Sequence, residues 1–190
     1  GGGFGVYYTE KDTAIDVEKF MKSMIEHIEK SLEKESMNIK KISIEPGRSI
    51  IGNAGSTLYR VGGKKETFGG VKYVFIDGGM TDNIRPALYQ AEYEAVLANK
   101  LDVVEDEIVT VAGKCCESGD LIIKNGKLGK AEAGDLLLVA TTGAYGYSMS
   151  SNYNKAQRPA VVFVKDGKSA ISIKRESLED LVRNDVDMEL

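Results

Sequence analysis

The chain has 190 residues, of which 42% are hydrophobic and 28% are charged, and its formal net charge at pH 7 is −4. This composition is typical of a globular chain with one domain or two small ones, and it gives no general reason to expect nucleic-acid or membrane-surface binding. Its two cysteines are adjacent and it has a single histidine, which argues against a disulfide framework and against a zinc site, and favours a reducing, cytoplasmic setting.

The chain begins with Gly1-Gly2-Gly3-Phe4-Gly5 and has no initiator methionine. Glycines let backbone N–H groups approach a phosphate that a Cβ would block, so this cluster is a weak candidate phosphate site. A glycine cluster of this kind normally follows a strand. We therefore expect the chain to be the later part of a longer protein, with leftover linker glycines as the alternative.

An amphipathic helix is predicted from Ala14 to about Glu35, because apolar residues recur there at intervals of three and four. Thr13 and Asp16 resemble the start of a capping box. A short strand is predicted at Lys41–Ile44, and it leads into Glu45-Pro46-Gly47-Arg48. Helix, strand and polar loop in this order indicate a β/α barrel or a doubly wound sheet, in which chemistry gathers at the carboxyl ends of strands.

After about Gly55 the pattern changes to short strands separated by glycine-containing turns. The predicted strands are 58–61, 71–76, 107–111, 121–124, 136–140, 160–165 and 169–175. Asn125-Gly126 and Asp166-Gly167 are typical hairpin turns, and a short helix is predicted to start at Ser177. We expect an α+β fold that is mainly β, with a helix–strand remnant of an α/β domain in residues 1–55 and a β-barrel or β-sandwich domain in residues 56–190.

Two loops carry groups that suit a ligand. The segment 77–89 contains Arg85 and Tyr89, which are close enough in sequence to reach one anion, and Pro86 predicts extended backbone at Arg85. The segment 142–154 is rich in small, hydroxyl and tyrosine residues and is typical of a binding wall. Ordinary surface loops remain the alternative for both segments.

The sequence Cys115-Cys116-Glu117-Ser118-Gly119-Asp120 places thiols beside a carboxylate. A thiol can donate a proton when its surroundings tune its pKa. Free cysteine is also among the most buried residue types, so a packing role is the alternative. Glu45 could likewise pair with a protonated ring nitrogen and Arg48 could grip a carboxylate, with a surface salt bridge as the alternative.

Five motifs occur in a set order: Gly-Gly-Gly-Phe-Gly, Glu-Pro-Gly-Arg, Asp-Gly-Gly-Met with Arg-Pro-Ala-Leu-Tyr, Cys-Glu-Ser-Gly-Asp, and Gly-Ala-Tyr-Gly-Tyr-Ser. In this order they resemble the diaminopimelate decarboxylases, and the resemblance runs from Gly1 to the final helix. It implies the last βα elements of an alanine-racemase-like TIM barrel followed by a β domain. It further implies pyridoxal 5′-phosphate as cofactor, decarboxylation of meso-2,6-diaminopimelate to L-lysine, and a homodimer.

The resemblance also implies roles for single residues. Gly2, Gly3 and Gly47 would bind the cofactor phosphate, and Glu45 would pair with the ring nitrogen. Arg48, Arg85 and Tyr89 would hold the distal end of the substrate. In the partner subunit's site, Cys116 would act as general acid and Glu117 would bind the distal amino group. Tyr145 would touch cofactor and substrate.

One feature departs from the family pattern. No lysine of this chain sits in a motif like that of the family's Schiff-base lysine, and Lys114 does not resemble that position. We therefore expect the chain alone to be inactive. A non-catalytic regulatory homologue is one alternative. Another is a decarboxylase of ornithine or arginine, although Glu117 together with Arg85 better suits a substrate with an amino group and a carboxylate at its far end.

Overall fold

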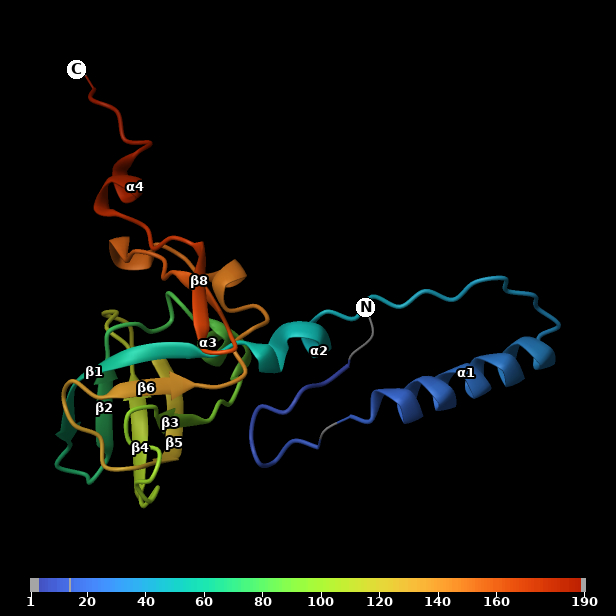
Figure 1. Cartoon of the computed structure of the whole chain (residues 1–190), viewed down its shortest axis with the longest axis horizontal. Coiled ribbons are helices and arrows are strands. Elements are labelled where there is room, and N and C mark those ends of the chain that lie inside the picture. Colours follow the sequence, from blue (N-terminus) through green and yellow to red (C-terminus); the bar gives the residue numbers. More distant parts are fainter. Residues whose placement is uncertain (1–3, 14, 189–190) are drawn as a thin grey trace.

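The computed structural model describes residues 4–13 and 15–188. Its centre is a six-stranded sheet in the order β3-β6-β1-β2-β4-β5 (Figure 1). The edge strands β3 and β5 also contact each other, so the sheet curls into a nearly closed barrel. The six strands are β1 Thr57–Glu66, β2 Lys72–Ile76, β3 Ala95–Leu97, β4 Glu107–Ala112, β5 Leu121–Leu128 and β6 Leu136–Val139. This confirms the predicted sheet-rich domain, while TIM-barrel elements are not seen in the described residues.

Neighbouring strands of the barrel are antiparallel except for one pair. β2 and β4 run parallel, with Tyr73 opposite Thr110 and Phe75 opposite Ala112. Parallel strands cannot be joined by a tight turn. The connection between them instead contains α3, Arg85–Tyr89, and the short strand β3. Because parallel strands end at the same edge of a sheet, the loops that follow β2 and β4 leave the barrel at the same end.

The barrel interior is filled by apolar side chains that alternate with outward-facing ones. In β1, Tyr59 and Val61 are 4% and 1% exposed, whereas Leu58 of the same strand is 56% exposed. In β6, Leu137 and Val139 are completely buried. This two-residue period is what places one face of each strand in the core.

Replacing Leu137 by alanine is expected to destabilise the chain by about 3 kcal/mol, because the lost methyl groups leave a cavity among packed neighbours. Leu58→Ala is the matched control, since Leu58 is 56% exposed and a surface change of this kind costs within about 0.5 kcal/mol. Urea unfolding followed by circular dichroism measures both. Equal shifts in the two midpoints would contradict the burial pattern.

The N-terminal part lies to one side of the barrel. Helix α1, Val17–Lys34, is followed by an extended segment that returns to α2, Arg48–Ile51, and to the 3-10 turn η1, Gly52–Ala54 (Figure 1). The apolar residues of α1 remain accessible, with Phe20 41% exposed. Phe20 contacts Phe4 edge to face, with ring centroids 5.3 Å apart.

Two predictions about this N-terminal part are wrong. Helix α1 begins at Val17 and is capped by Asp16, whose side chain accepts the Lys19 N–H at 3.0 Å. Asp16 is therefore the N-cap residue, the position that the predicted capping box assigned to Thr13. Aspartate has the stronger N-cap preference of the two residue types. Ala14, where the helix was expected to begin, lies outside the described residues. Lys41–Ile44 is extended but forms no ladder with any described strand, and β propensity alone does not make a strand.

Two further predictions are wrong: the extended backbone at Arg85 and the hairpin turn at Asn125-Gly126. Arg85 starts helix α3 and is not extended, because a proline in the first turn lacks only an N–H that has no helical acceptor. Asn125-Gly126 does not form a hairpin turn. Asn125 adopts a φ of 52° inside β5, where the pairing with β4 shifts register. Such a bulge uses the same left-handed freedom as a turn. The short strand β3 was not predicted.

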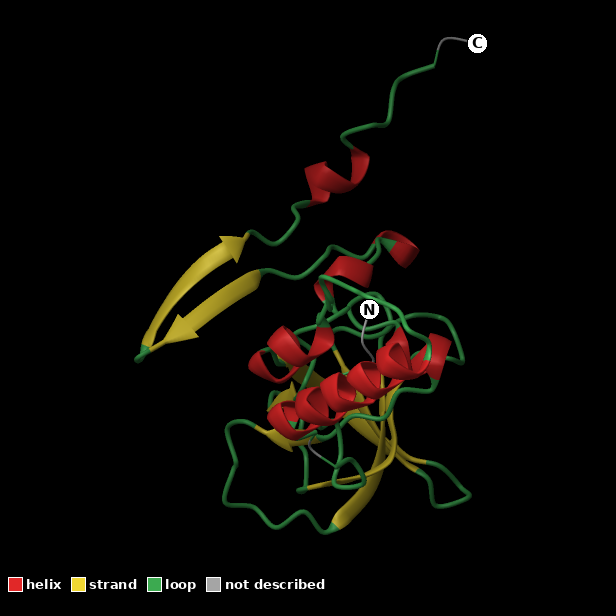
Figure 2. Ribbon diagram, turned by 90° about the vertical axis from the view of Figure 1, so that its right-hand side faces the viewer, coloured by secondary structure: helices red, strands yellow, loops and turns green. Residues whose placement is uncertain are grey.

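The C-terminal part is as predicted. β7, Val161–Lys165, and β8, Lys168–Ile173, form a hairpin whose turn residues Asp166 and Gly167 have φ values of 51° and 72°. Helix α4, Leu178–Val182, starts at a capping box formed by Ser177 and Asp180. Figure 2 shows the hairpin and α4 projecting from the barrel.

The segment 142–154 forms the 3-10 turns η2, Tyr147–Met149, and η3, Tyr153–Lys155.

Two absences concern the described residues only. None of their helices combines the length and the apolar character needed to cross a bilayer. Within the same ranges, 4–13 and 15–188, no cluster of histidine, cysteine and carboxylate side chains is arranged to hold a metal ion.

Candidate functional site

Two arginines and two tyrosines form a compact cluster where the N-terminal part meets the barrel. Arg85 is 7% exposed and its Nη1 donates a hydrogen bond of 2.7 Å to the hydroxyl of Tyr8. The Arg85 guanidinium lies 5.3 Å from the Tyr8 ring centroid and 5.6 Å from that of Tyr145. The Arg48 guanidinium lies 5.9 Å from each ring. These distances are in the range of cation–π contacts.

The cluster holds two cations without a compensating anion. Among residues 4–13 and 15–188, no ion pair joins Arg48 or Arg85 to a carboxylate. Arg48 Nε is buried and has no hydrogen-bond acceptor. Burying a guanidinium in this way costs free energy unless a partner neutralises it. The arrangement therefore suits an anionic group of a ligand, such as a carboxylate held by two-pronged contacts.

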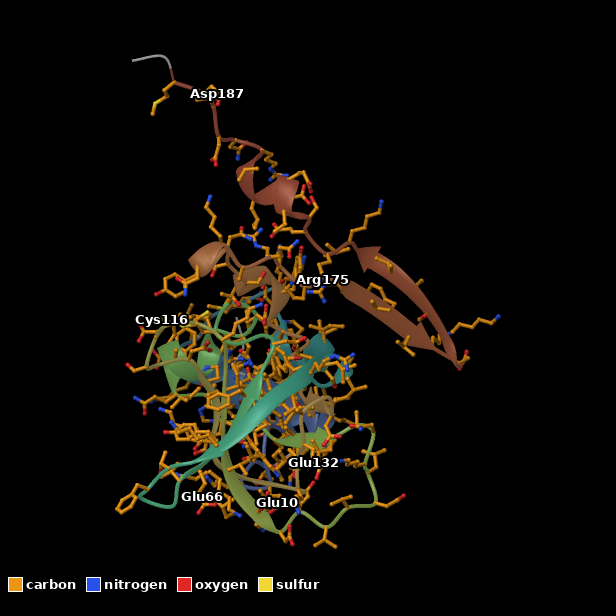
Figure 3. The ribbon with its side chains drawn as sticks, turned by 90° about the vertical axis from the view of Figure 1, so that its left-hand side faces the viewer. Glu10, Glu66, Cys116, Glu132, Arg175 and Asp187 are labelled. Carbon is orange, nitrogen blue, oxygen red and sulfur yellow. The ribbon has the colours of Figure 1, made fainter. Side chains whose placement is uncertain are left out.

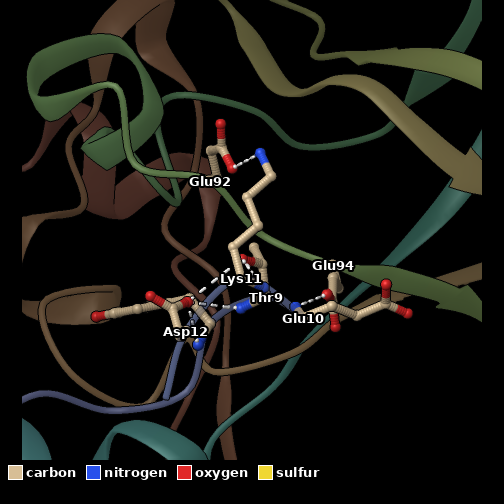
Figure 4. Close-up of polar contacts among 7 residues, drawn as sticks. Thr9, Glu10, Lys11, Asp12, Glu92 and Glu94 are labelled. Atoms are coloured by element: carbon tan, nitrogen blue, oxygen red, sulfur yellow. Dashed lines mark hydrogen bonds and ion pairs between the residues drawn. The ribbon is translucent and has the colours of Figure 1, made fainter.

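The turn that follows Tyr8 is fixed by polar contacts of Thr9, Glu10, Lys11 and Asp12 (Figure 4). Asp12 Oδ2 accepts the backbone N–H groups of Tyr8 and Thr9 at 3.0 and 2.8 Å. Lys11 Nζ lies 2.6 Å from a carboxylate oxygen of Glu92, in the segment between α3 and β3. The sequence analysis assigned Tyr8 no role. The local signal that could have pointed to it is the pair Tyr7-Tyr8, which follows shortly after the glycine cluster.

The predicted cofactor residues of the Glu-Pro-Gly-Arg motif lie beside the loop 142–154. A Cβ built on Gly47 would lie 3.6 Å from the hydroxyl of Tyr145, so the two segments are in contact. Tyr145 itself adopts a φ of 62°. Gly47 is the N-cap of α2 and has no side chain that could accept the N–H groups of the first turn, while its carbonyl accepts the Ile50 N–H at 3.0 Å. Glu45 is exposed. Gly2 and Gly3 lie outside the described residues.

Tyr89 ends α3 and is 62% exposed. It stands one helical turn after Arg85, which places both on the same side of the helix. The Glu-Pro-Gly-Arg segment could hold a phosphorylated cofactor with a protonated ring, because Arg48 Nε has no hydrogen-bond acceptor and a carboxylate stands three residues earlier in the same motif. Among the predicted site residues, the described contacts bring together Arg48, Arg85, Gly47 and Tyr145.

The thiol motif forms a separate turn between β4 and β5. Cys116 is exposed, and Figure 3 shows it at the surface of the barrel. Glu117 is also exposed, and its Oε1 accepts the Gly119 N–H at 3.1 Å and the Ser118 hydroxyl at 3.3 Å. No hydrogen bond, ion pair or ring contact among the described residues joins this turn to the arginine–tyrosine cluster. The chain therefore presents two sets of predicted site residues at separate places.

The adjacent cysteines differ in their surroundings. Cys115 is half-buried, and burial, together with the charge of Asp120 and a hydrogen bond to it, raises the pKa of the Cys115 thiol to about 11. Cys116 is exposed. Because the thiolate is the nucleophile, the two thiols should be distinguishable by alkylation.

At pH 8 the Cys115→Ser variant, which keeps Cys116, is expected to react with iodoacetamide at least about tenfold faster than Cys116→Ser, which keeps Cys115. The rate for Cys115 should still be rising above pH 9. Mass spectrometry of timed samples measures both rates, and urea-unfolded samples supply the control in which the difference should vanish. Equal rates in the folded chain would contradict the placement of the two side chains.

A cavity of about 500 Å³ lies elsewhere, between the turn at Glu10 and the facing parts of β3 and β5. Its lining includes Tyr93, Val96 and Ile123. None of the predicted site residues that the structure describes lines it.

Comparison with known proteins gives this arrangement a family. Residues 6–143 match the family described as pyridoxal-dependent decarboxylase, C-terminal sheet domain. The chain belongs to this decarboxylase family. It is 51% identical to the diaminopimelate decarboxylase of Bacillus subtilis (strain 168) over 186 residues, which cover 98% of this chain and 42% of that protein.

Solved structures agree with this assignment. The diaminopimelate decarboxylase from M. jannaschii, in complex with L-lysine, matches with a TM-score of 0.88 at 34% identity, covering 98% of this chain and 42% of that one. The lysine/ornithine decarboxylase from Vibrio vulnificus, in complex with putrescine, matches with a TM-score of 0.64 at 25% identity over 83% of this chain and 40% of that one. The chain thus spans less than half the length of these pyridoxal-dependent decarboxylase relatives.

Proposed function

We propose that this chain is the C-terminal part of a diaminopimelate decarboxylase, which converts meso-2,6-diaminopimelate to L-lysine and CO2 with pyridoxal 5′-phosphate. The observation that carries the proposal is the buried Arg85, flanked by Tyr8 and Tyr145 and paired with no carboxylate among the described residues. A substrate whose far end carries a carboxylate would neutralise this guanidinium. Ornithine has no such group, so the cluster favours diaminopimelate.

The residues around the cluster divide into cofactor and substrate contacts. Gly47, with Gly2 and Gly3, would bind the cofactor phosphate, and Glu45 would hold the ring nitrogen in its protonated form. When bound, the cofactor supplies a ring that accepts the electron pair released as CO2 leaves. Arg48 would face both cofactor and substrate, and Tyr145 would cover them. Arg85 and Tyr89 would fix the distal carboxylate.

Cys116 would donate the proton that replaces CO2 on the substrate carbon, and Glu117 would bind the distal amino group. Both side chains are exposed and neither contacts the arginine–tyrosine cluster within the described residues. This separation supports a homodimer in which each subunit lends Cys116 and Glu117 to its partner's site. We further propose that residues 1–55 complete a cofactor-binding barrel, that residues 56–190 form the β domain, and that the enzyme is cytoplasmic.

The experiment is a CO2-release assay on the full-length protein with added pyridoxal 5′-phosphate. Substrates are meso-diaminopimelate, L-ornithine and L-arginine. Because the site is built to pair with a distal carboxylate, we expect a preference in kcat/KM of about 10⁴-fold for diaminopimelate. Preference for ornithine or arginine would overturn the substrate. Absence of CO2 release from all three would favour the non-catalytic regulatory alternative.

A further inference from the structure

The carboxylate of Asp120 lies buried where the loops that follow β2 and β4 meet. Asp120 is 2% exposed, and its two oxygens accept backbone N–H groups from different loops. Oδ1 accepts the Met80 N–H at 2.6 Å, and Oδ2 accepts the Cys115 N–H at 2.8 Å. One side chain thus joins the loop that precedes Arg85 to the turn that carries Cys116.

Main-chain hydrogen bonds continue this junction on either side. The Lys114 N–H donates to the Gly78 carbonyl at 3.0 Å, and the Gly113 N–H donates to the Asp120 carbonyl at 2.9 Å. Within the turn, the Asp120 N–H donates to the Glu117 carbonyl at 3.0 Å. Cys116 lies between these anchored positions and forms no hydrogen bond of its own among the described residues.

The two loops approach the carboxylate so closely that only glycine fits beside it. A Cβ built on Gly79 would lie 2.4 Å from Asp120 Oδ1, and one built on Gly113 would lie 2.2 Å from Oδ2. Gly79 also has a φ of 153°, which side chains rarely adopt. The glycines of the Asp-Gly-Gly-Met motif and the aspartate of the Cys-Glu-Ser-Gly-Asp motif are therefore parts of one junction, although 40 positions separate Met80 from Asp120.

Asp120 accepts the backbone N–H groups of Met80 and Cys115 and also the Cys115 thiol, and among the described residues it forms no ion pair. Its hydrogen bonds therefore fix the path of the turn without adding a charged side chain to it. Hydrogen bonds from N–H groups to a carboxylate are about twice as strong as neutral ones. An isosteric amide cannot replace them, because its NH2 group would face one of the two N–H donors.

Resting on the function proposed above, we propose that Asp120 is a positioning residue that holds the Cys116–Glu117 turn against the loop 78–83 and so sets the direction from which the Cys116 thiol approaches the substrate. A misplacement of about 1 Å in a reacting group can cost about 10²-fold in rate. Loss of this junction should therefore lower kcat through Cys116.

The test is a double-mutant cycle in the full-length protein. Asp120→Asn is expected to lower kcat for diaminopimelate by about 10- to 100-fold and to change KM by less than about threefold. In a Cys116→Ala background the same change should cost less than about twofold, because the group that it positions is gone. An equal loss in both backgrounds, or an unchanged kcat in the Cys116 background, would overturn the proposal.

Asp77→Asn is the matched control, since Asp77 Oδ1 accepts the Arg60 N–H at 2.9 Å outside this junction. Its kcat should stay within about twofold of the unsubstituted protein. Asp120→Ser, which keeps one acceptor oxygen, provides a second variant if the amide does not fold. Its kcat should fall between those of Asp120→Asn and the unsubstituted protein, and a kcat at or below that of the amide variant would count against the proposal.

A measurement on this chain alone separates the proposal from the proposed function. In the Cys116→Ser background at pH 8, Asp120→Asn should raise the rate of Cys115 alkylation by at least about tenfold, because the turn is released and a neighbouring negative charge is lost. Asp77→Asn should leave the rate unchanged. Release of the turn in this assay, without CO2 release by the full-length protein, would refute the decarboxylase but not the junction. An unchanged alkylation rate would refute the junction itself.

Discussion

Replacing Arg85 by methionine should raise the KM for diaminopimelate by about 10²-fold without lowering the stability of the chain. Loss of one partner from a buried charge pair costs about 2–5 kcal/mol of binding free energy. In the free chain Arg85 is 7% exposed, and its guanidinium pairs with no carboxylate among the described residues. Methionine removes this desolvated charge and keeps most of the volume, so the midpoint of thermal unfolding should stay the same or rise.

Arg60→Met serves as the control, since Arg60 is an exposed residue of β1 outside the cluster. It should leave KM unchanged. Steady-state CO2 release by the full-length protein and calorimetry of this chain measure the two effects separately. An Arg85→Met variant with a normal KM would remove Arg85 from the substrate site. A large loss of stability with a normal KM would identify a purely structural role.

Replacing Cys116 by alanine should lower kcat of the full-length protein by about 10²- to 10⁴-fold, the range attributed to a positioned general acid. Cys115→Ala is a control that differs by a single position. Because Cys115 is half-buried and its raised thiol pKa of about 11 keeps it protonated in the neutral range, its removal should affect packing more than turnover. We expect a kcat within about threefold of the unsubstituted value.

The proton itself can be followed to check this role. With deuterated solvent, Cys116→Ala should show a changed solvent isotope effect on product formation as well as a lower rate. Undiminished turnover in Cys116→Ala, or a larger loss in Cys115→Ala, would show that the assignment of the two thiols is wrong.

Much of the barrel was predictable because its strands carry local signals. Short apolar runs separated by glycine-containing turns marked five of the six barrel strands, and the left-handed pair Asp166-Gly167 correctly marked the outer hairpin. Strand β3 is only three residues long, Ala95–Leu97, and its pattern is too short to stand out. Asn125 shows the other limit: a residue that tolerates positive φ can end a strand or bulge within it, and only the pairing with β4 decides between them.

The site was predictable in its residues but not in its grouping. Motif resemblance pointed to Arg48, Arg85 and Tyr145, and the structure places their side chains within one cluster. Tyr8 and Asp120 were missed as functional candidates because their partners, Arg85 and Met80, are 77 and 40 positions away. A sequence pattern states which groups are present, whereas such long-range contacts depend on the closed barrel.

The parallel pairing of β2 with β4 bears on the order in which the chain folds. Tyr73 must meet Thr110 across a connection that includes α3 and β3, whereas β4 and β5 can pair as neighbours along the chain. Closing the longer connection costs more chain entropy before any contact compensates for it, which slows formation of such pairs. We therefore expect the end of the barrel that carries Arg85 and Cys116 to form late in folding, after the β4–β5 hairpin.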